Sequence, residues 1–265
     1  MTPVAVVTGA ARGIGAATVH GLAAAGWSVV AVDRAADDPR LPYPMGSEAE
    51  LFGVVDAAVG AASGARVIAH VADTTDPDEL GRAVALAEAE FGGLDAMVSV
   101  AGVIAGGVPL WEMPAHELRA VLDVDLWGPI TAARVGIPAL QRRPAPRQGR
   151  FLAVASAAAS RGLALLAAYG AAKAGVAGLV RGLGAELADS GVTANAVSPG
   201  STDTAILEQS ARLYGLDDRH AFADQQPVKR LLTPEEVAAV LVWLAGPDSS
   251  ALTGAVIPAD GGLSL

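Results

Sequence analysis

Tyr169 and Lys173 are the two side chains in this sequence whose types and spacing point most directly to proton transfer. Four positions apart, they share one face of a helix, so the lysine ammonium can lie near the phenol. A free tyrosine has a pKa of about 10, and a nearby cation favours the phenolate. Ser156, which precedes them, would hold the oxygen of an alcohol or carbonyl group while Tyr169 exchanges its proton. The pattern predicts acid–base chemistry at a carbon–oxygen bond.

Taken alone, this pattern is weak, because a tyrosine and a lysine at this spacing occur often by chance. The structural alternative is a tyrosine packed on a helix beside a lysine whose aliphatic stem lies along apolar surface. A serine at a suitable distance and an independent cofactor motif reverse these odds. Such a motif lies near the start of the chain.

The glycine-rich stretch Thr8-Gly9-Ala10-Ala11-Arg12-Gly13-Ile14-Gly15 follows a short apolar run and precedes a segment of helical composition. Gly9 permits a sharp exit from a strand, Gly13 lets the backbone approach a pyrophosphate, and Gly15 allows close packing of a helix on the strand. The amides at the helix N-terminus would face the phosphates. A plain tight turn is the alternative if no acidic residue ends the next strand.

Asp33 supplies that acidic residue, since it ends the next apolar run. Its carboxylate can accept hydrogen bonds from both ribose hydroxyls of an adenosine, which predicts NAD as the cofactor. Arg12 and Arg34 would favour a 2′-phosphate, but Asp33 would repel that dianion at close range. Asp73 is placed to accept a bond from the adenine amino group, or else to cap a helix within Asp73-Thr74-Thr75-Asp76.

The elements that must position these residues alternate along the whole chain. Apolar runs typical of buried strands alternate with segments of helical composition, which indicates a parallel sheet covered by helices on both faces. We predict strands at 3–8, 27–32, 66–71, 96–100, 151–155, 193–197 and 255–258, and helices at 16–25, 48–62, 77–91, 114–140, 168–188 and 234–245. The fold class is α/β: residues 1–265 form a single doubly wound Rossmann-fold domain with a parallel sheet of about seven strands.

Composition excludes several classes of function. The 18 Lys and Arg residues against 28 Asp and Glu residues give a net charge of -10, so neither a nucleic acid nor a membrane surface is expected as a partner. The absence of cysteine excludes disulfides and thiolate chemistry, and the 4 histidines show no metal-ligand spacing. Residues 13–32 are uncharged, but glycines and His20 interrupt them, which favours two buried elements over a membrane span. We expect a cytoplasmic protein without a metal.

Two irregular segments are expected beyond the carboxyl ends of strands. Residues 35–47 form a proline-stiffened insertion beside Asp33, where a lid would slow the release of NAD; a plain surface loop is the alternative. Residues 201–232 are expected to cover the substrate. Apolar side chains there indicate a pocket for a small apolar alcohol or ketone, or else a helix pair packed on the core: Ala205, Ile206, Leu207, Leu213, Tyr214 and Leu216.

Four motifs stand in an order that is typical of one family: the T-G-x-x-x-G-x-G turn, Ser156 with Tyr169 and Lys173, Asn195-Ala196-Val197-Ser198-Pro199-Gly200, and Asp260-Gly261-Gly262. Through them the sequence resembles the short-chain dehydrogenase/reductase family over essentially its whole length. The resemblance implies that Tyr169 is the acid/base, that Lys173 binds the nicotinamide ribose and lowers the pKa of Tyr169, and that Ser156 orients the substrate. It also implies a homotetramer and cofactor contacts from Ala101, Gly102, Pro199, Gly200, Thr202 and Thr204.

Two positions depart from the family's pattern. Ser99-Val100-Ala101-Gly102 stands where the family reads N-N-A-G; the backbone path can survive, but two side-chain amides are lost. Asp125, in Val124-Asp125-Leu126-Trp127-Gly128, stands where a catalytic asparagine is expected. An ionised aspartate accepts hydrogen bonds but cannot donate them, and its charge would stabilise Lys173 while opposing the Tyr169 phenolate. We expect an altered proton relay that includes Asp125 rather than an inactive enzyme.

The insertion at residues 35–47 indicates a particular subgroup of the family. Its P-Y-P core and the following E-A-E-L are similar to those of the mycofactocin-coupled, carveol-dehydrogenase-like subgroup. That resemblance implies oxidation of a secondary alcohol with NAD that does not exchange, and electron transfer to the peptide-derived carrier mycofactocin. An ordinary short-chain reductase with exchangeable NAD, acting on 3-oxoacyl or steroid-like carbonyls, is the second interpretation. A non-catalytic NAD-binding protein is the third, and the retained Ser156, Tyr169 and Lys173 argue against it.

Overall fold

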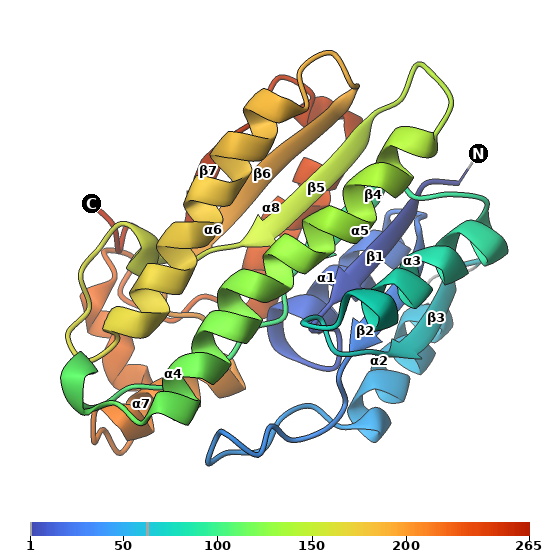
Figure 1. Ribbon diagram of the computed structural model, residues 1–265. Helices are drawn as coiled ribbons and strands as arrows, with labels where there is room; N and C mark the ends of the chain where they lie inside the picture. Colours follow the sequence, from blue (N-terminus) through green and yellow to red (C-terminus); the bar gives the residue numbers. More distant parts are fainter. Residues whose placement is uncertain (1, 62–63) are drawn as a thin grey trace.

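The computed structural model describes residues 2–61 and 64–265. These residues form a parallel sheet of seven strands in the order β3-β2-β1-β4-β5-β6-β7, with helices on both faces (Figure 1). The strands are β1 (Val4–Thr8), β2 (Ser28–Asp33), β3 (Arg66–Val71), β4 (Ala96–Ser99), β5 (Gly149–Val154), β6 (Val192–Pro199) and β7 (Val256–Ala259). The predicted α/β class, a doubly wound parallel sheet of about seven strands, is confirmed.

Each face of the sheet has its own hydrophobic core, because successive strand residues point to opposite faces. One core contains Val4 and Val6 of β1 and lies under α3 (Pro77–Phe91), α5 (Gly128–Arg142) and α6 (Ala167–Glu186). The other contains Ala5 and Val7 and lies under α1 (Gly13–Ala24), α2 (Glu48–Ala61) and α8 (Pro234–Ala245). Burial on both faces explains why the strands read as nearly continuous apolar runs in the sequence.

The strand order reverses between β1 and β4, which pair although β2 and β3 lie between them in the sequence. Such a switch opens a crevice at the carboxyl ends of the strands, where ligands bind in sheets of this type. The loops after β1 and β4 approach each other here. A Cβ on Gly9, whose φ is +68°, would lie 2.7 Å from backbone atoms of Ala101. Glycine is therefore required at this position by both its backbone conformation and its surroundings.

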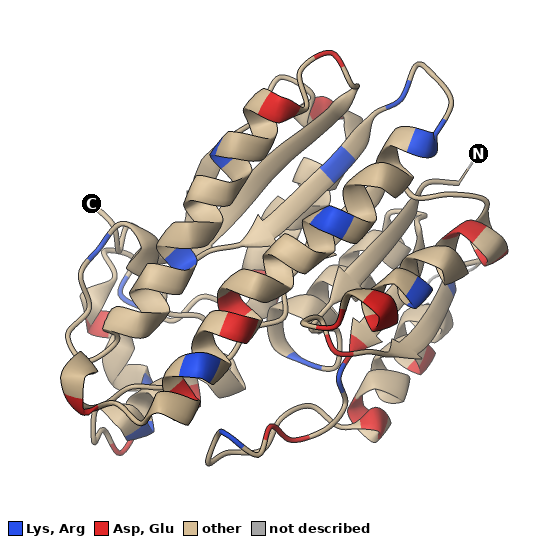
Figure 2. Cartoon of the chain, in the orientation of Figure 1, with Lys and Arg blue, Asp and Glu red and all other residues tan. Residues whose placement is uncertain are grey.

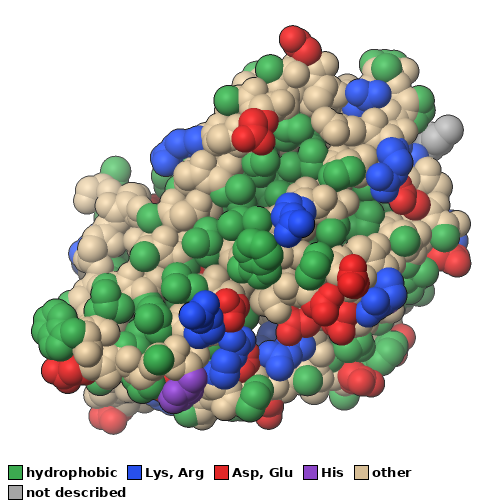
Figure 3. Space-filling model, in the orientation of Figure 1, with side chains coloured by type: hydrophobic (Ala, Val, Ile, Leu, Met, Phe, Trp, Pro, Cys, Tyr) green, Lys and Arg blue, Asp and Glu red, His purple; other side chains and the backbone are tan. Residues whose placement is uncertain are grey.

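The strands of the sheet contain few charged residues. Of the strand residues, only Asp33, Arg66 and Arg150 carry a formal charge, and the strands are nearly free of charge colours in Figure 2. In Figure 3, hydrophobic side chains cover much of the middle of the visible face, over α5 and α6. The low charge content of the sequence follows from a sheet that is covered on both faces.

The segment predicted as one helix at 114–140 is interrupted. It consists of α4 (Ala115–Leu122), a π-helical turn (Asp123–Trp127) and α5. Turns of this kind are rare and occur frequently at functional sites. Here the turn carries Asp125, which is fully buried. The helical composition of the segment predicts a helix but contains no signal for this change of hydrogen-bond pattern.

Residues 201–232 contain one α-helix and one 3-10 helix, so the segment is helical as in the alternative that the sequence left open. Helix α7 (Ala205–Leu213) begins after Thr204, whose Oγ1 accepts a hydrogen bond from Leu207 N at 3.4 Å. Arg219–Gln225 forms a 3-10 helix. The threonine cap and the burial of one face of α7 explain the helix. The predicted end of α2 at residue 62 lies outside the described residues.

The uncharged run at residues 13–32 is divided between α1 and β2, as expected for two buried elements. Within residues 2–61 and 64–265, no helix is long and apolar enough to cross a membrane. The same two ranges contain no group of three or more His, Cys, Asp or Glu residues that could hold a metal ion.

Replacing Gly15 by alanine is expected to destabilise the protein, because a Cβ at this position would overlap the carbonyl oxygen of Gly9. Overpacking of this kind costs about 1–3 kcal/mol in the free energy of unfolding. The matched control is Gly53→Ala in α2, where a Cβ meets open space and higher helix propensity contributes up to about 1 kcal/mol. Urea unfolding measures both variants. Equal midpoints for the two would show that the contact between α1 and the glycine turn is not tight.

Candidate active site

A cavity of about 630 Å³ opens at the carboxyl ends of the strands. It is lined by every residue that the sequence predicted for catalysis or cofactor binding. From the first half of the chain these are Gly9, Arg12, Gly13, Ile14, Gly15, Asp33, Arg34, Asp73, Ala101, Gly102 and Asp125. From the second half they are Ser156, Tyr169, Lys173, Pro199, Gly200, Thr202 and Thr204. The fold therefore brings the whole predicted set together in one site.

The glycine turn after β1 meets the requirements of a phosphate site. Gly9 and Gly13 have φ values of +68° and +58°, a region that favours glycine. No side chain caps the N-terminus of α1, and its first turn contains no acidic residue. The amides at this helix end can therefore bind an anion, which the helix dipole also favours. These residues fit the pyrophosphate of a dinucleotide.

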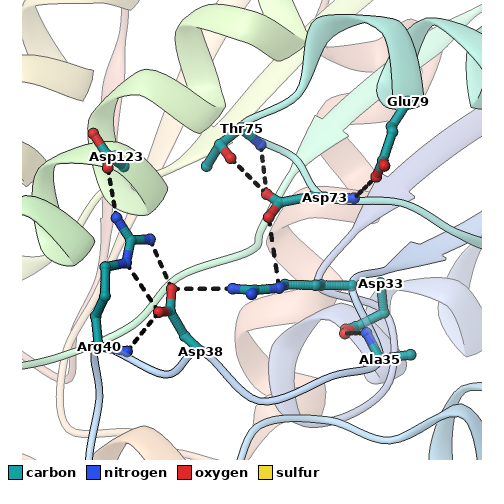
Figure 4. A network of polar contacts seen from close by, with 9 residues as sticks. Asp33, Ala35, Asp38, Arg40, Asp73, Thr75, Glu79 and Asp123 are labelled. Atoms are coloured by element: carbon teal, nitrogen blue, oxygen red, sulfur yellow. Dashed lines mark hydrogen bonds and ion pairs between the residues drawn. The ribbon is translucent and has the colours of Figure 1, made fainter.

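Asp33 lies beside the glycine turn, at the end of β2. Its Oδ2 accepts a hydrogen bond from Ala11 N and its Oδ1 accepts one from Ala35 N, both at 3.0 Å; the second contact is drawn in Figure 4. Each carboxylate oxygen keeps acceptor capacity for a ribose hydroxyl. A 2′-phosphate would meet this negative charge at close range, so the site fits NAD better than NADP.

The Arg34 guanidinium contacts two carboxylates, which leaves it less available for the 2′-phosphate of NADP. Its Nη1 donates to Asp38 Oδ2 at 3.0 Å, and its Nε lies 3.5 Å from Asp73 Oδ2. Asp73 Oδ1 also accepts hydrogen bonds from the amide and the hydroxyl of Thr75 (Figure 4). Helix α3 is capped by Asp76, whose side chain accepts two amides of the first turn. The capping role considered for Asp73 therefore belongs to Asp76.

Lys173 and Asp125 form a buried ion pair beside Tyr169. Lys173 Nζ lies 3.0 Å from Asp125 Oδ1, and their side chains are 4% and 0% exposed. The ammonium also donates to the carbonyl oxygen of Val154 at 3.1 Å and lies 5.7 Å from the centre of the Tyr169 ring. The spacing of Tyr169 and Lys173 in α6 thus brings the ammonium to the phenol, and the π-helical turn supplies the carboxylate that pairs with it.

The charges of this group act on Tyr169 in opposite directions. Burial raises the pKa of Tyr169 and outweighs Lys173, which lowers it. Asp125 raises the pKa of Tyr169 further, whereas a hydrogen bond with Ser156 lowers it. The expected effect of Lys173 is therefore present, but the net pKa of Tyr169 lies above its ordinary value.

The pKa values of the ion pair itself follow from the same balance. Burial lowers the pKa of Lys173, but the neighbouring Asp125 and Tyr169 raise it above the ordinary lysine value, so the lysine stays a cation. Burial raises the pKa of Asp125, whereas the charge of Lys173 and the Val103 amide lower it. The net pKa of Asp125 lies above its ordinary value, because burial outweighs these two contacts.

Asp125, which stands where the family has a catalytic asparagine, accepts hydrogen bonds through both carboxylate oxygens. Its Oδ1 and Oδ2 lie 3.3 and 3.4 Å from Val103 N, which donates to them, and Oδ1 pairs with Lys173. A Cβ on Gly102 would lie 2.9 Å from Asp125 Oδ1, so the loop after β4 passes close to the ion pair. Asp125 acts on Tyr169 through Lys173 and through its own charge, which makes it a positioning residue.

The backbone of the loop after β4 is held by the side chain of Thr8. Thr8 Oγ1 accepts hydrogen bonds from Val100 N at 3.1 Å and from Ala101 N at 3.3 Å. Ser99 Oγ is buried and has no hydrogen-bond partner among the described residues. The Thr8 hydroxyl therefore anchors the backbone at this departure from N-N-A-G, and the side chain of Ser99 takes no part.

Tyr43, which lines the cavity, and Gln226, which bonds to the lining residue Ser201, have roles that the sequence did not indicate. Tyr43, in the 35–47 segment, is buried, and its hydroxyl accepts a hydrogen bond from Ile104 N at 2.8 Å. Gln226 is fully buried; its Oε1 accepts from Ser201 N at 2.8 Å and its Nε2 donates to Ser201 O at 3.2 Å. Both contacts join segments far apart in the chain, which no local pattern reveals.

The fold and the site define the class of protein: an oxidoreductase with a dinucleotide crevice and a serine, tyrosine and lysine set at the carboxyl end of its sheet. A family model described as Enoyl-(Acyl carrier protein) reductase matches residues 9–264. The chain belongs to this family, which is part of the short-chain dehydrogenases/reductases. The prediction that the protein is an enzyme of this type is confirmed.

Relatives of known name match nearly the whole chain. Cis-4-hydroxycyclohexanecarboxylate dehydrogenase of Sinomonas cyclohexanicum is 38% identical over 261 residues, which cover 98% of this chain and 95% of that protein. D-beta-hydroxybutyrate dehydrogenase of Rhizobium meliloti (strain 1021) is 33% identical over 270 residues, covering 99% and 98%. The crystal structure of carveol dehydrogenase from Mycobacterium avium in complex with NAD has a TM-score of 0.92 at 26% identity, covering 98% of this chain and 97% of that chain.

Proposed function

We propose that this protein oxidises a secondary alcohol to a ketone with NAD that stays bound between turnovers, and that mycofactocin carries the electrons away. The observation that carries the proposal is the 35–47 segment, which bonds to both sides of the cofactor crevice. The similarity to a carveol dehydrogenase that was crystallised with NAD also supports it.

The cofactor is NAD, as the sequence predicted. The glycine turn fits its pyrophosphate and Asp33 fits its adenosine ribose. When bound, NAD supplies the hydride acceptor for alcohol oxidation.

Ser156, Tyr169 and Lys173 perform the proton chemistry. Ser156 binds the hydroxyl oxygen of the substrate, and Tyr169 as phenolate accepts the hydroxyl proton. Lys173 stabilises that phenolate because its ammonium lies next to the ring. Asp125 keeps Lys173 charged in a site where burial alone would favour the neutral amine.

The 35–47 segment contacts both walls of the crevice. Beside the glycine turn, Arg12 Nη2 donates to Pro44 O at 2.9 Å. On the other wall, Arg40 pairs with Asp123 of the π-helical turn at 2.7 Å (Figure 4), and the Tyr43 hydroxyl accepts from the amide of Ile104. A dinucleotide under this segment would leave only after these contacts break, which slows its release.

The segment is also held together internally. Asp38 is 2% exposed and accepts hydrogen bonds from the Arg40 side chain at 2.9 and 2.7 Å, and from its backbone amide. The Arg40 guanidinium holds the pKa of Asp38 well below its ordinary value, so the carboxylate stays charged. Such a bonded network distinguishes the segment from a plain surface loop.

Replacing Tyr43 by alanine is expected to release NAD. The change removes the contact with Ile104 and the buried ring, and each 1.4 kcal/mol lost corresponds to a factor of about ten in affinity. Wild-type protein purified without added cofactor is expected to contain stoichiometric NAD after denaturation, and the Tyr43→Ala protein much less. The control is Phe52→Ala on α2, because Phe52 is exposed and does not line the cavity.

The same preparation tests the coupling to an electron carrier. The wild-type protein is expected to oxidise alcohols with an artificial electron acceptor, such as a dye, without added NAD. Wild-type protein that is purified empty and turns over normally on added NAD would contradict the proposal.

That result would instead support a second candidate, an ordinary reductase with exchangeable NAD that acts on 3-oxoacyl or steroid-like carbonyls. The similarity to 3-oxoacyl-[acyl-carrier-protein] reductase MabA of Mycobacterium tuberculosis, which is 34% identical over 261 residues, supports this candidate. It predicts reduction of a 3-oxoacyl thioester with added NADH.

A further inference from the structure

We propose that Arg161 binds a carboxylate of the substrate, so that the protein's substrates are secondary alcohols on an apolar ring or chain with a carboxylate at the far end. The inference rests on the proposed alcohol oxidation and names its substrate class. It follows from the distribution of charge in the substrate pocket, by which we mean the part of the cavity lined by residues 156–169, 205–225 and Leu263.

Arg161 lies in the loop that joins the two residues at the reacting oxygen. Ser156 follows β5, the loop passes through Arg161, and α6 begins shortly before Tyr169. All three side chains belong to residues that line the same cavity. A substrate whose hydroxyl lies at Ser156 and Tyr169 therefore extends into a pocket that Arg161 borders.

Among the residues that the structure describes, Arg161 is the one charged residue that lines the substrate pocket. The other lining residues there are apolar or uncharged, among them Leu163, Ile206, Leu207 and Phe222. The remaining charged residues of the cavity lie at the cofactor crevice or in the Lys173–Asp125 pair. An apolar pocket with a single cation at its border suits an apolar ligand that has one anionic group.

The polar groups of neighbouring pocket residues are already engaged. Tyr214 donates its hydroxyl proton to the carbonyl oxygen of Ala164 at 2.6 Å, and Ser210 Oγ donates to Ile206 O at 2.8 Å. The first bond joins the end of α7 to the loop at Ala164, and the second lies within α7. Both leave the two hydroxyls little capacity to donate to a ligand. Beyond the catalytic pair, the side-chain donors that line the pocket include the neutral amide of Gln225 and the guanidinium of Arg161, of which Arg161 carries the charge.

The guanidinium of Arg161 has unused donors. Its Nη1 donates to Leu263 O at 2.7 Å, which holds the side chain in place. A guanidinium has five N–H donors in a planar fork, so most of them are free of this contact. The ion pairs among the described residues do not include Arg161. Its positive charge is therefore not neutralised within the described part of the protein.

The net charge of -10 opposes an anionic substrate, but only weakly at short range. The Debye length is about 8 Å at physiological ionic strength, so distant carboxylates on the surface are largely screened. A guanidinium in contact with a carboxylate forms two parallel charge-assisted hydrogen bonds, which are about twice as strong as neutral ones. The local contact therefore decides which substrates bind.

The experiment compares one alcohol with and without its charge. Protein is assayed with 4-hydroxycyclohexanecarboxylate and with its methyl ester, using bound NAD and a dye as electron acceptor. We expect the wild type to prefer the carboxylate, and Arg161→Met to lower kcat/KM for it by about 10- to 100-fold, the effect of a lost hydrogen bond to a charged group. The ester should be oxidised equally by both proteins.

Two controls separate binding from a structural role. Arg181→Met removes an exposed arginine of α6 that does not line the cavity, and it should leave both substrates unaffected. Arg161→Lys keeps the charge but not the fork and should restore part of the preference for the carboxylate. If Arg161→Met slows both substrates equally, the residue only supports the contact with Leu263, and the proposal is overturned.

A binding measurement separates this proposal from the proposed function. Cyclohexanecarboxylate is titrated into the NADH-loaded protein and followed by NADH fluorescence. If neither alcohol is oxidised but this anion binds to the wild type and not to Arg161→Met, the proposed function fails while the assignment of Arg161 stands. A wild type that oxidises the ester as well as the carboxylate overturns the assignment alone.

Discussion

The Tyr169→Phe variant is expected to lose nearly all alcohol oxidation while keeping its cofactor. The phenylalanine ring fills the same space in the cavity, but it cannot accept the proton of the substrate hydroxyl. Loss of a positioned general base lowers kcat by about 10²–10⁴-fold. Turnover with a dye acceptor measures the loss, and the NAD content of the denatured protein measures cofactor binding. Wild-type turnover in this variant would contradict the assignment of Tyr169 as the base.

Ser156→Ala provides the comparison for this experiment. Ser156 binds the reacting oxygen and lowers the pKa of Tyr169 through its hydrogen bond, but it does not take the proton. We therefore expect a smaller loss of kcat than in Tyr169→Phe and a shift of the acidic limb of the pH profile to higher pH. The two variants together separate proton transfer from orientation of the substrate.

The parts of the site that the sequence predicts are those that depend on local geometry. The glycine turn is required by the backbone conformation at Gly9 and by the close approach of Ala101, and both constraints leave a mark in the sequence. The placement of Asp33 follows from the length of one strand–helix–strand unit. The pairing of Tyr169 with Lys173 follows from helical spacing. The backbone conformation of Gly9, the placement of Asp33 and the spacing of Tyr169 and Lys173 each depend on a short stretch of chain, whereas the approach of Ala101 to Gly9 joins distant segments.

The parts that the sequence misses depend on contacts between distant segments. The hydrogen bond between Tyr43 and Ile104 and the ion pair between Arg40 and Asp123 each join the 35–47 segment to a separate element. No periodic pattern records which wall of a crevice a loop will contact. The sequence therefore indicates an insertion beside Asp33, but only the structure shows that it bonds to the opposite side.

Asp125 depends both on a local sequence motif and on a contact with a distant segment. Replacing it by alanine is expected to lower the free energy of unfolding more than the other substitutions considered. Its position in the chain identifies it as the residue at the asparagine site, but its direct pairing with Lys173 depends on the π-helical turn. Removal of one partner from a buried ion pair leaves an uncompensated charge and costs about 3–5 kcal/mol. Urea unfolding of Asp125→Ala at pH 7 measures this loss. A midpoint close to that of the wild type would show that water reaches Lys173.

Asp125→Asn separates the charge of Asp125 from its shape. The amide oxygen can still accept a hydrogen bond from Lys173, so the unfolding free energy should fall less than in Asp125→Ala. Removing the negative charge removes a cause that raises the pKa of Tyr169. Oxidation requires the phenolate, so a lower pKa of Tyr169 moves the acidic limb of the kcat profile to lower pH. A shift to higher pH would contradict this expectation and would mean that Lys173 loses its proton without the carboxylate, so that the lost cation outweighs the lost negative charge.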